Sequence, residues 1–383
     1  MIHIATIPAE GLDFETFLEV PRTIHDQDSR WREHSSARTR RMLARGLNPF
    51  WRQAESALFL AWAGARPVGR IGATRRSVAG QEAAGTRDGF FGFFESIADP
   101  DVARALLTAA ADWLGERGCT RLLGPCQPTP DFDGFGLLVE GFDARRLSGE
   151  SFNPDYYPAL FAACGLHPEK DYFSFQNNML DNPVFEREMA RLGRYRARHA
   201  SARVRSFDVA RFERDTAIVR DILACAYADQ PLYAPLDFDT YAFHLHTLAR
   251  REDMHWFLIV EIDGQPVGVN LLAPNENERL HGAAPRGIGT SEFSILPEYH
   301  HTQAAAALFH DSWARARRQG FAWASMAYQD EHHVSMHRML EKVGSFRAKR
   351  FRLYQMPLNA ATDPASTGPA SALALTTRHP GTV

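Results

Sequence analysis

An internal repeat restricts the fold of this chain most strongly, because the same order of elements occurs twice. The first copy reads ALFLAWAGARPVGRIGATRRS (residues 57–77), and the second reads MHWFLIVEIDGQPVGVNLLAP (residues 254–274). In each copy an apolar strand passes through a glycine-containing turn into Pro-Val-Gly. The pattern predicts a β-hairpin in each copy, with Asp263-Gly264 as the stronger turn signal.

The similarity of the two copies continues beyond the hairpins. Short apolar strands are expected at 89–97 and 289–297, and each is followed by an amphipathic helix and then a further strand, at 119–125 and 321–328. The helix stripes consist of Val102, Ala105, Leu106, Ala109, Trp113 and Leu114, and of Ala305, Leu308, Phe309, Ser312, Trp313 and Ala316. Recurrence after about 200 residues predicts a duplicated mixed α/β domain. The alternative is two unrelated α/β domains with a chance match.

The bulk properties exclude several classes of protein. A length of 383 residues favours two domains, and a formal net charge of −3 gives no overall attraction to nucleic acid or to a membrane. No apolar run approaches the roughly 20 residues that span a bilayer. The four scattered cysteines and the absence of a signal-peptide pattern predict reduced thiols in a cytoplasmic protein without a membrane partner.

Composition also suggests where the domains divide. We expect a first domain at 1–180, an arginine-rich charged linker or helix at 181–206 and a second domain at 207–357. Residues 358–383 are rich in Ala, Thr, Pro, Ser and Gly and lack apolar periodicity, which predicts a disordered tail.

The C-terminal copy resembles the GNAT N-acyltransferases in both element order and motifs. The strand-to-helix turn reads ILPEY (295–299) followed by HHTQAA (300–305), and LEKVG (340–344) stands before a final strand AKRFRLYQM. The whole of residues 1–357 looks like a group of bacterial tandem-GNAT proteins, through NPFWRQAESALFLAWAGARPVGRI, GFFGFFE and FNPDYYPALFAACGL. The resemblance implies an α/β fold with a mixed sheet, in two tandem GNAT-like domains of which the N-terminal one is degenerate.

The resemblance also implies acyl-CoA as co-substrate, held by the second domain. Its positions would be Ser294, Ile295, Leu296, His300, His301, Thr302, Gln303, Ala304 and Ala305. The helix of the first domain opens Asp99-Pro100-Asp101, so its carboxylates would repel a diphosphate from the positive end of the helix dipole. The turn at 300–305 has no acid, although it also lacks the glycines that usually let the backbone approach the phosphates.

Acyl transfer to an amine needs a base, and two groups of residues offer one. Glu292 lies two residues before Ser294, so alternation along the strand puts both side chains on one face. Tyr328, His332 and His333 lie beyond the next strand, where a GNAT active site opens, and an imidazole there would serve as base or acid at neutral pH. No third ligand accompanies the adjacent histidines, so no metal is expected.

The first domain is expected to help build the acceptor site. Its polar, aromatic and turn-rich loops suit a substrate pocket better than a core. The candidate substrate residues are Glu95, Asp131, Asp133, Asn153, Tyr156 and Tyr157.

The leading interpretation is an acyl-CoA-dependent N-acyltransferase that acylates a small amine or an amino-acid-like acceptor. An aminoacyl-tRNA-dependent transferase is one alternative, which the glycine-free turn and the arginine-rich segment favour and the acidic net charge does not. Nucleic acid is expected as a partner under that alternative alone. The other alternative is a non-catalytic protein that has kept the fold and binds a ligand.

Overall fold

The fold is that of a computed structural model. It describes residues 1–28, 31, 36–76, 87–132, 134–198, 201–230, 232–280 and 282–358. Residues 359–383 of the predicted tail therefore lie outside the described residues.

The described residues of the N-terminal part form seven strands and five helical segments. The strands are β1 (Ile2–Ile7), β2 (Ala54–Ala63), β3 (Arg66–Arg76), β4 (Asp88–Ser96), β5 (Arg121–Gly124), β6 (Leu137–Glu140) and β7 (His167–Asn178). The helices are α1 (Leu12–His25), α2 (Ser36–Leu43), η1 (Pro49–Arg52), α3 (Pro100–Gly115) and α4 (Tyr157–Ala163).

The C-terminal part repeats much of this order. Its strands are β8 (Ala202–Ser206), β9 (Phe257–Ile262), β10 (Gln265–Pro274), β11 (Gly287–Ile295), β12 (Trp323–Asp330) and β13 (Phe346–Pro357). Its helices are α5 (Pro183–Arg198), η3 (Val209–Arg211), α6 (Phe212–Ala226), α7 (Phe238–Leu248), η4 (Arg251–Trp256), α8 (Glu276–Leu280), η5 (Pro297–Tyr299), α9 (Ala304–Arg318) and α10 (Val334–Lys342).

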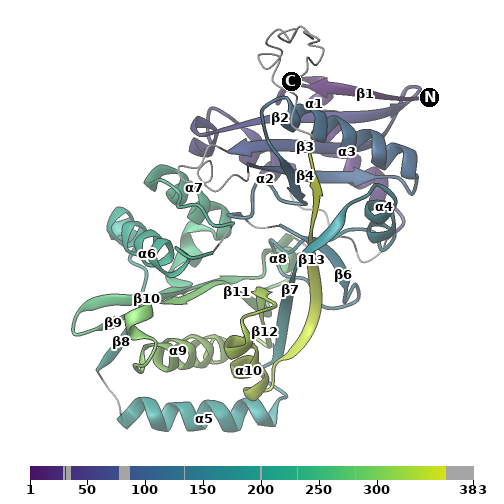
Figure 1. Ribbon diagram of the computed structural model, residues 1–383. Helices are drawn as coiled ribbons and strands as arrows, with labels where there is room; N and C mark the ends of the chain where they lie inside the picture. Colours follow the sequence, from purple (N-terminus) through teal and green to yellow (C-terminus); the bar gives the residue numbers. More distant parts are fainter. Residues whose placement is uncertain are drawn as a thin grey trace, which may run out of the picture.

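The described strands form one mixed sheet that joins the two halves (Figure 1). The order along the sheet is β1-β2-β3-β4-β5-β13-β7-β12-β11-β10-β9-β8, with β6 paired to β13. The predicted mixed α/β fold is therefore confirmed. The halves share their last strands, because β7 pairs with β12 and β13 pairs with β5. The strands are thus exchanged across the boundaries expected at 180 and 206.

Both predicted hairpins form. β2 pairs with β3 and β9 with β10, each antiparallel. At the second turn Asp263 has φ 50° and Gly264 has φ 80°. Two successive residues with positive φ are the geometry that an Asp-Gly dipeptide favours in a two-residue hairpin turn.

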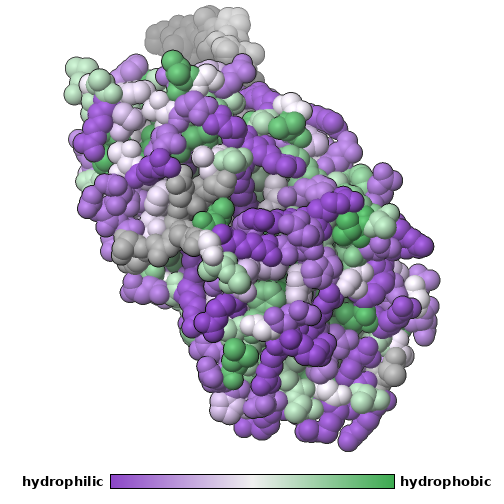
Figure 2. Space-filling view, turned by 180° about the vertical axis from the view of Figure 1, so that it is seen from behind, coloured by the Kyte–Doolittle hydropathy of each residue, from purple (hydrophilic) through white to green (hydrophobic). Residues whose placement is uncertain are grey.

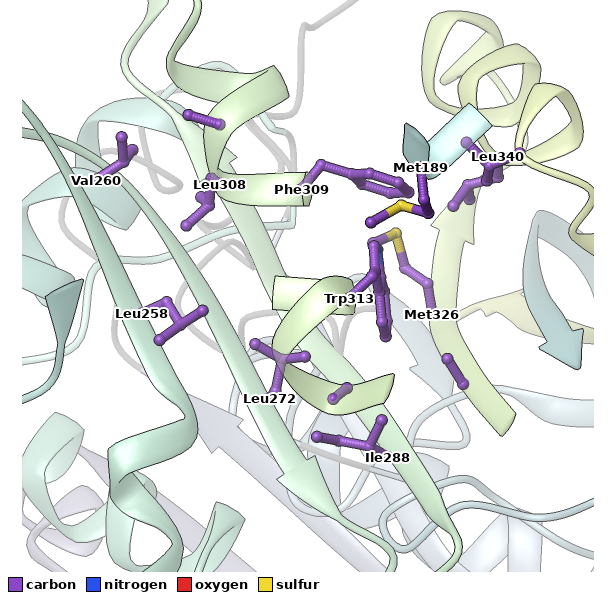
Figure 3. Close-up of a cluster of buried hydrophobic side chains, with 14 of the residues drawn as sticks. Met189, Leu258, Val260, Leu272, Ile288, Leu308, Phe309, Trp313, Met326 and Leu340 are labelled. Atoms are coloured by element: carbon purple, nitrogen blue, oxygen red, sulfur yellow. The ribbon is translucent and has the colours of Figure 1, made fainter. Parts of the chain in front are cut away.

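Each half of the sheet is covered by helices on both faces. In the C-terminal half, α9 lies over one face and buries Leu308 and Trp313 against strand residues such as Leu272 (Figure 3). α6 and α7 cover the opposite face. In the N-terminal half, α3 and α4 cover one face and α1 covers the other.

The segment expected as a charged linker folds as part of the C-terminal half. Helix α5 buries Phe185 and Met189 in the same core as α9. Arg196 on α5 reaches Asp311 on α9 at 3.5 Å. The other arginines of α5 are exposed, whereas Arg205 on β8 pairs with Asp215 and Glu261, each at 2.6 Å. No helix of the described residues is long and apolar enough to cross a membrane, and the face seen in Figure 2 scatters its hydrophobic side chains among hydrophilic ones.

Parallel strand pairs separate at the same point in both halves. β4 pairs with β5 over residues 88–90, and β11 pairs with β12 over residues 287–290. Beyond these residues β4 and β11 each continue to their ends without that neighbour. The separation opens a gap in each half of the sheet, and the residues around these gaps determine what each half can bind.

Candidate functional site

Glu292 lies on β11 just beyond the point where this strand leaves β12. Its Oε2 accepts a 2.7 Å hydrogen bond from the hydroxyl of Tyr227, the residue that follows α6. The same hydroxyl is also hydrogen-bonded to Ser294. Glu292 and Ser294 therefore face α6 and α7, whereas Phe293 between them packs on the α9 side. The Glu292 carboxylate therefore lies on the face of the sheet that α6 and α7 cover, whereas α9 covers the other face.

Tyrosines surround this carboxylate. The rings of Tyr227 and Tyr233 lie 5.4 Å apart, and the buried hydroxyl of Tyr241 has no hydrogen-bond partner among the described residues. Burial, and then the charge of Glu292, raises the pKa of Tyr227 and of Tyr241 well above the usual value. Both phenols therefore remain protonated donors at neutral pH, and the Tyr241 hydroxyl is a buried donor without a partner among the described residues.

A loop of the N-terminal half contacts the connection between α6 and α7 through Asp131. Asp131 is buried and binds Arg76 at 2.6 Å. Its other oxygen accepts a hydrogen bond of 3.4 Å from the backbone N–H of Ala234, in the connection between α6 and α7. Burial raises the pKa of Asp131, although Arg76 opposes the shift. Asp131 thus anchors the loop that carries Tyr233, as a structural contact between the halves.

The start of α9 suits an anion. Its first turn has no acidic residue and begins with alanines, and Thr302 Oγ1 accepts a 3.2 Å hydrogen bond from the N–H of Ala304. His300 places its Nε2 3.0 Å from the carbonyl oxygen of Ile295. Gln303, although it lies in this turn, hydrogen-bonds Ser201 through its side chain. Small side chains and a helix dipole without competing acid fit the diphosphate of a CoA thioester.

The corresponding start of α3 is already neutralised. The side chain of Asp99 accepts a 2.8 Å hydrogen bond from the N–H of Asp101, and Pro100 between them has no N–H to donate. Asp101 places a second carboxylate in the first turn. A diphosphate approaching this end would meet like charge and few free donors.

The gap beside β4 is filled by the chain itself. Tyr157 accepts a hydrogen bond from the N–H of Ser96 at 2.9 Å, and Tyr156 donates one to the Ser96 carbonyl at 2.7 Å. A Cβ atom at Gly92 would lie 1.5 Å from the carbonyl oxygen of Cys126. Backbone groups that a thioester arm would contact are therefore occupied. Of the two gaps, the one beside β11 remains the candidate for an acyl donor.

Glu95 has a different setting from Glu292. Its Oε2 accepts a 2.8 Å hydrogen bond from the Tyr157 hydroxyl and lies 3.0 Å from Nε2 of His25. Burial alone would raise the pKa of Glu95, but His25 and Arg70 lower it below the usual value. The sequence pointed to Glu95, Tyr156 and Tyr157, but it gave no signal for His25, which lies 70 residues from Glu95 along the chain.

The residues expected beyond β12 are dispersed. His332 is exposed, with 82% of its side chain accessible. His333 is exposed as well, and partial desolvation, with a smaller contribution from His300, lowers its pKa. The Tyr328 hydroxyl accepts a 2.9 Å hydrogen bond from the N–H of Ser151, and its ring stacks on Phe135. Tyr328 therefore contacts the 149–151 loop, and it is not joined to Glu292 by a direct hydrogen bond.

Two expected substrate residues lie elsewhere. Asn153 is buried, and its amide hydrogen-bonds both the N–H and the carbonyl of Leu138, which is a structural role. Asp133 lies outside the described residues. Among those that are described, no group of three or more His, Cys, Asp or Glu side chains is arranged to hold a metal ion.

Comparison with known proteins supplies the family. No family model matches the chain. The bacterial ceramide synthase of Caulobacter vibrioides is 30% identical over 279 residues, which cover 72% of this chain and 71% of the relative. The chain belongs to the family of this protein. Protein YghO of Escherichia coli K12 is 24% identical over 386 residues, covering 90% of this chain and 92% of its own length.

Solved structures agree on the fold. A tandem GNAT protein from the clavulanic acid biosynthesis pathway superposes with a TM-score of 0.60 at 12% identity, over 94% of this chain and 100% of that one. A GCN5-related N-acetyltransferase from Sphaerobacter thermophilus gives 0.55, also at 12% identity, over 96% of this chain and 98% of its own. The predicted tandem GNAT architecture is confirmed, and acyl transfer is the class of chemistry that this fold and family support.

Proposed function

We propose that the protein is an N-acyltransferase that moves an acyl group from a CoA thioester to the primary amine of a long-chain amino alcohol. The observation that carries the proposal is the Glu292 carboxylate, which lies on β11 just beyond its pairing with β12 and is oriented by Tyr227 at 2.7 Å. The name of the Caulobacter relative supports the choice of acceptor, since a ceramide is the N-acyl derivative of a long-chain amino alcohol.

The donor would enter from the α9 side of the sheet. The acid-free first turn of α9 would hold the diphosphate, with Ala304 and Ala305 leaving room for the phosphate oxygens. The thioester would then reach the gap between β11 and β12. The N-terminal gap lacks this capacity, because Tyr156, Tyr157 and Cys126 occupy it.

The acceptor would bind on the opposite face, under α6 and α7. Its ammonium group is attracted by Glu292, and the unpartnered hydroxyl of Tyr241 can hydrogen-bond a hydroxyl of the amino alcohol. Holding both substrates across one gap converts a bimolecular reaction into an intramolecular one.

The reaction then needs one proton transfer to the protein. Glu292 takes a proton from the ammonium group, and the free amine attacks the thioester carbonyl. A carbon–nitrogen bond forms, and the carbon–sulfur bond breaks as the tetrahedral intermediate collapses. The nitrogen gives up its second proton as the amide forms, and this proton passes through water to the departing CoA sulfur, which leaves as the thiol. The proton taken by Glu292 is then released to solvent. Tyr227 would keep the carboxylate oriented throughout, because its hydroxyl stays protonated.

The test is product formation by the purified protein. Palmitoyl-CoA is incubated with sphinganine, with ethanolamine or with lysine, and both thiol release and the mass of the amide are measured. The proposal expects a product with sphinganine whose mass equals that of the amine plus the acyl group less one hydrogen atom. Preferential acylation of ethanolamine or lysine would contradict the long-chain acceptor. Absence of any amide and of any thiol release would contradict acyl transfer itself.

A further inference from the structure

A second pocket lies in the N-terminal half, away from Glu292. It has a volume of about 910 Å³, counted with its open mouth, and lies between helices α1 and α2, strand β4 and the 146–152 loop. The pocket occupies the face of β4 that corresponds to the Glu292 face of β11, but its chemistry is different.

Positive charge predominates among the described residues that line this pocket. They include four arginines (Arg22, Arg38, Arg70 and Arg146) and two glutamates (Glu95 and Glu150). Both carboxylates already have cationic or imidazole partners. Nζ of Lys349 lies 2.5 Å from Glu150, and Nε2 of His25 lies 3.0 Å from Glu95. An amine would therefore be repelled here, whereas an anion would be attracted.

Arg70 is the buried cation of this pocket. Its exposure is 6%, and it donates a 2.7 Å hydrogen bond to the carbonyl of Phe17. Its Nε has no hydrogen-bond partner among the described residues, and its Nη2 forms an ion pair with Glu95 at 4.0 Å, which is beyond hydrogen-bond length. A buried guanidinium with unmet donors is costly, and a bidentate anion would satisfy it.

The rest of the wall is mixed, with the polar side chains of Ser36, Thr39, Gln127 and Ser151 beside a group of apolar ones. Leu18, Trp31, Met42, Phe93 and Phe152 line the same space. Phe93 is held there by a left-handed backbone conformation with φ 52°, which places it next to the strand gap. A chain of methylene groups would be removed from water against these side chains.

We propose that this pocket binds an amphiphilic anion, a long-chain carboxylate or phosphate ester whose head group pairs with Arg70 and whose chain lies against Leu18, Met42 and Phe152. The site is separate from the proposed acyl-transfer centre and does not depend on it. It would give the N-terminal half, whose own donor gap is filled, a binding role of its own.

Isothermal titration of the full chain tests the proposal. The probes are dodecanoate, dodecyl phosphate, dodecanol and acetate, each kept below its micelle-forming concentration. We expect saturable binding of at least one of the two long-chain anions, and the tighter of them identifies the head group. Dodecanol and acetate, which lack the charge or the chain, should bind at least tenfold more weakly. Dodecanol binding as tightly as both anions would overturn the proposal.

Variants locate the binding. Arg70→Gln should weaken the Kd of the anion roughly ten- to hundredfold, as expected for loss of charged hydrogen bonds, and Arg70→Lys should weaken it less. Arg52→Gln removes the same charge outside the pocket and should leave Kd unchanged. Ala305→Glu, directed at the donor site on α9, should also leave it unchanged. An unaltered Kd in Arg70→Gln would overturn the proposal.

The variants need a folding control, because Arg70 is buried and its replacement could unfold the protein. Circular dichroism and Tm are recorded for each variant. Should Arg70→Gln not fold, Arg38→Gln at the half-buried rim of the pocket takes its place, with a several-fold rise in Kd expected. No change in that variant would then count against the site.

Discussion

The hydroxyl of Tyr227 donates a 2.7 Å hydrogen bond to the carboxylate of Glu292, which joins the end of α6 to β11 across 65 residues of sequence. Burial, and then the negative charge of Glu292, raises the pKa of Tyr227. The tyrosine therefore acts as a fixed donor, and it holds the carboxylate in one orientation at the edge of the gap.

Removing this donor should slow the reaction without abolishing it. In Tyr227→Phe the carboxylate remains but loses an orienting hydrogen bond, so we expect kcat to fall about tenfold with little change in KM for the acyl donor. Steady-state thiol release measures both constants. Tyr195→Phe, a change on the solvent side of α5, is the matched control. Equal kcat in the two variants would show that Tyr227 does not position the base.

A negative charge at the start of α9 should weaken donor binding. Ala305→Glu places a carboxylate in the first turn, where it competes with the diphosphate for the helix dipole, and we expect Kd for palmitoyl-CoA to rise roughly five- to tenfold. Ala305→Gln is nearly the same size and uncharged, so the difference between the two variants isolates the charge. If Ala305→Glu weakens binding no more than Ala305→Gln, the added charge has no effect, and the diphosphate does not lie at this helix start.

The close approach of Cys126 to Gly92 predicts that a side chain at position 92 destabilises the fold. In Gly92→Ala the new Cβ would lie 1.5 Å from the carbonyl oxygen of Cys126, so backbone has to move, and we expect a loss of at least about 3 kcal/mol in the free energy of unfolding. Gly46→Ala has no heavy atom within 4 Å of the new Cβ and should change little. Urea denaturation compares them. A small loss in Gly92→Ala would mean that the 126 loop does not pack into the gap.

Acid should unfold the protein partly through Glu95. Its pKa in the folded state is lowered from 4.5, so it contributes stability above that pH, and the contribution is lost as pH falls through the folded-state value. Glu95→Gln should therefore cost roughly 1–3 kcal/mol at pH 7 and progressively less below about pH 4.5. Urea denaturation across pH 3–7 measures this, with Glu55→Gln as the exposed control. A cost that is constant with pH would contradict the ionised network.

Local pattern was enough to predict the repeated units. The two hairpins follow from turn chemistry at Asp263-Gly264 and from alternating apolar residues. Helices α3 and α9 follow from stripes of apolar side chains. The alternation of side chains along a strand was sufficient to predict that Glu292 and Ser294 lie on one face.

Long-range pairing could not be derived in this way. The exchange of β7 and β13 between the halves depends on contacts between distant segments, and no local signal encodes it. The partners of Glu292 and Glu95 come from separate helices, at Tyr227 and His25. The sequence grouped Tyr328 with His332 and His333 after the predicted strand, and it gave no sign that the Tyr328 hydroxyl would accept a hydrogen bond from the N–H of Ser151, 177 residues away.

The central claim is that Glu292 takes the proton from the acceptor amine, and one comparison tests it most directly. Amide formation from palmitoyl-CoA and sphinganine is measured by mass spectrometry for Glu292→Gln and for Glu252→Gln, an exposed carboxylate on η4 with 69% of its side chain accessible. We predict that kcat falls by about 10²–10⁴ in Glu292→Gln and stays at the unmodified level in Glu252→Gln, while Kd for palmitoyl-CoA is the same in both. Full activity in a folded Glu292→Gln protein would contradict the account.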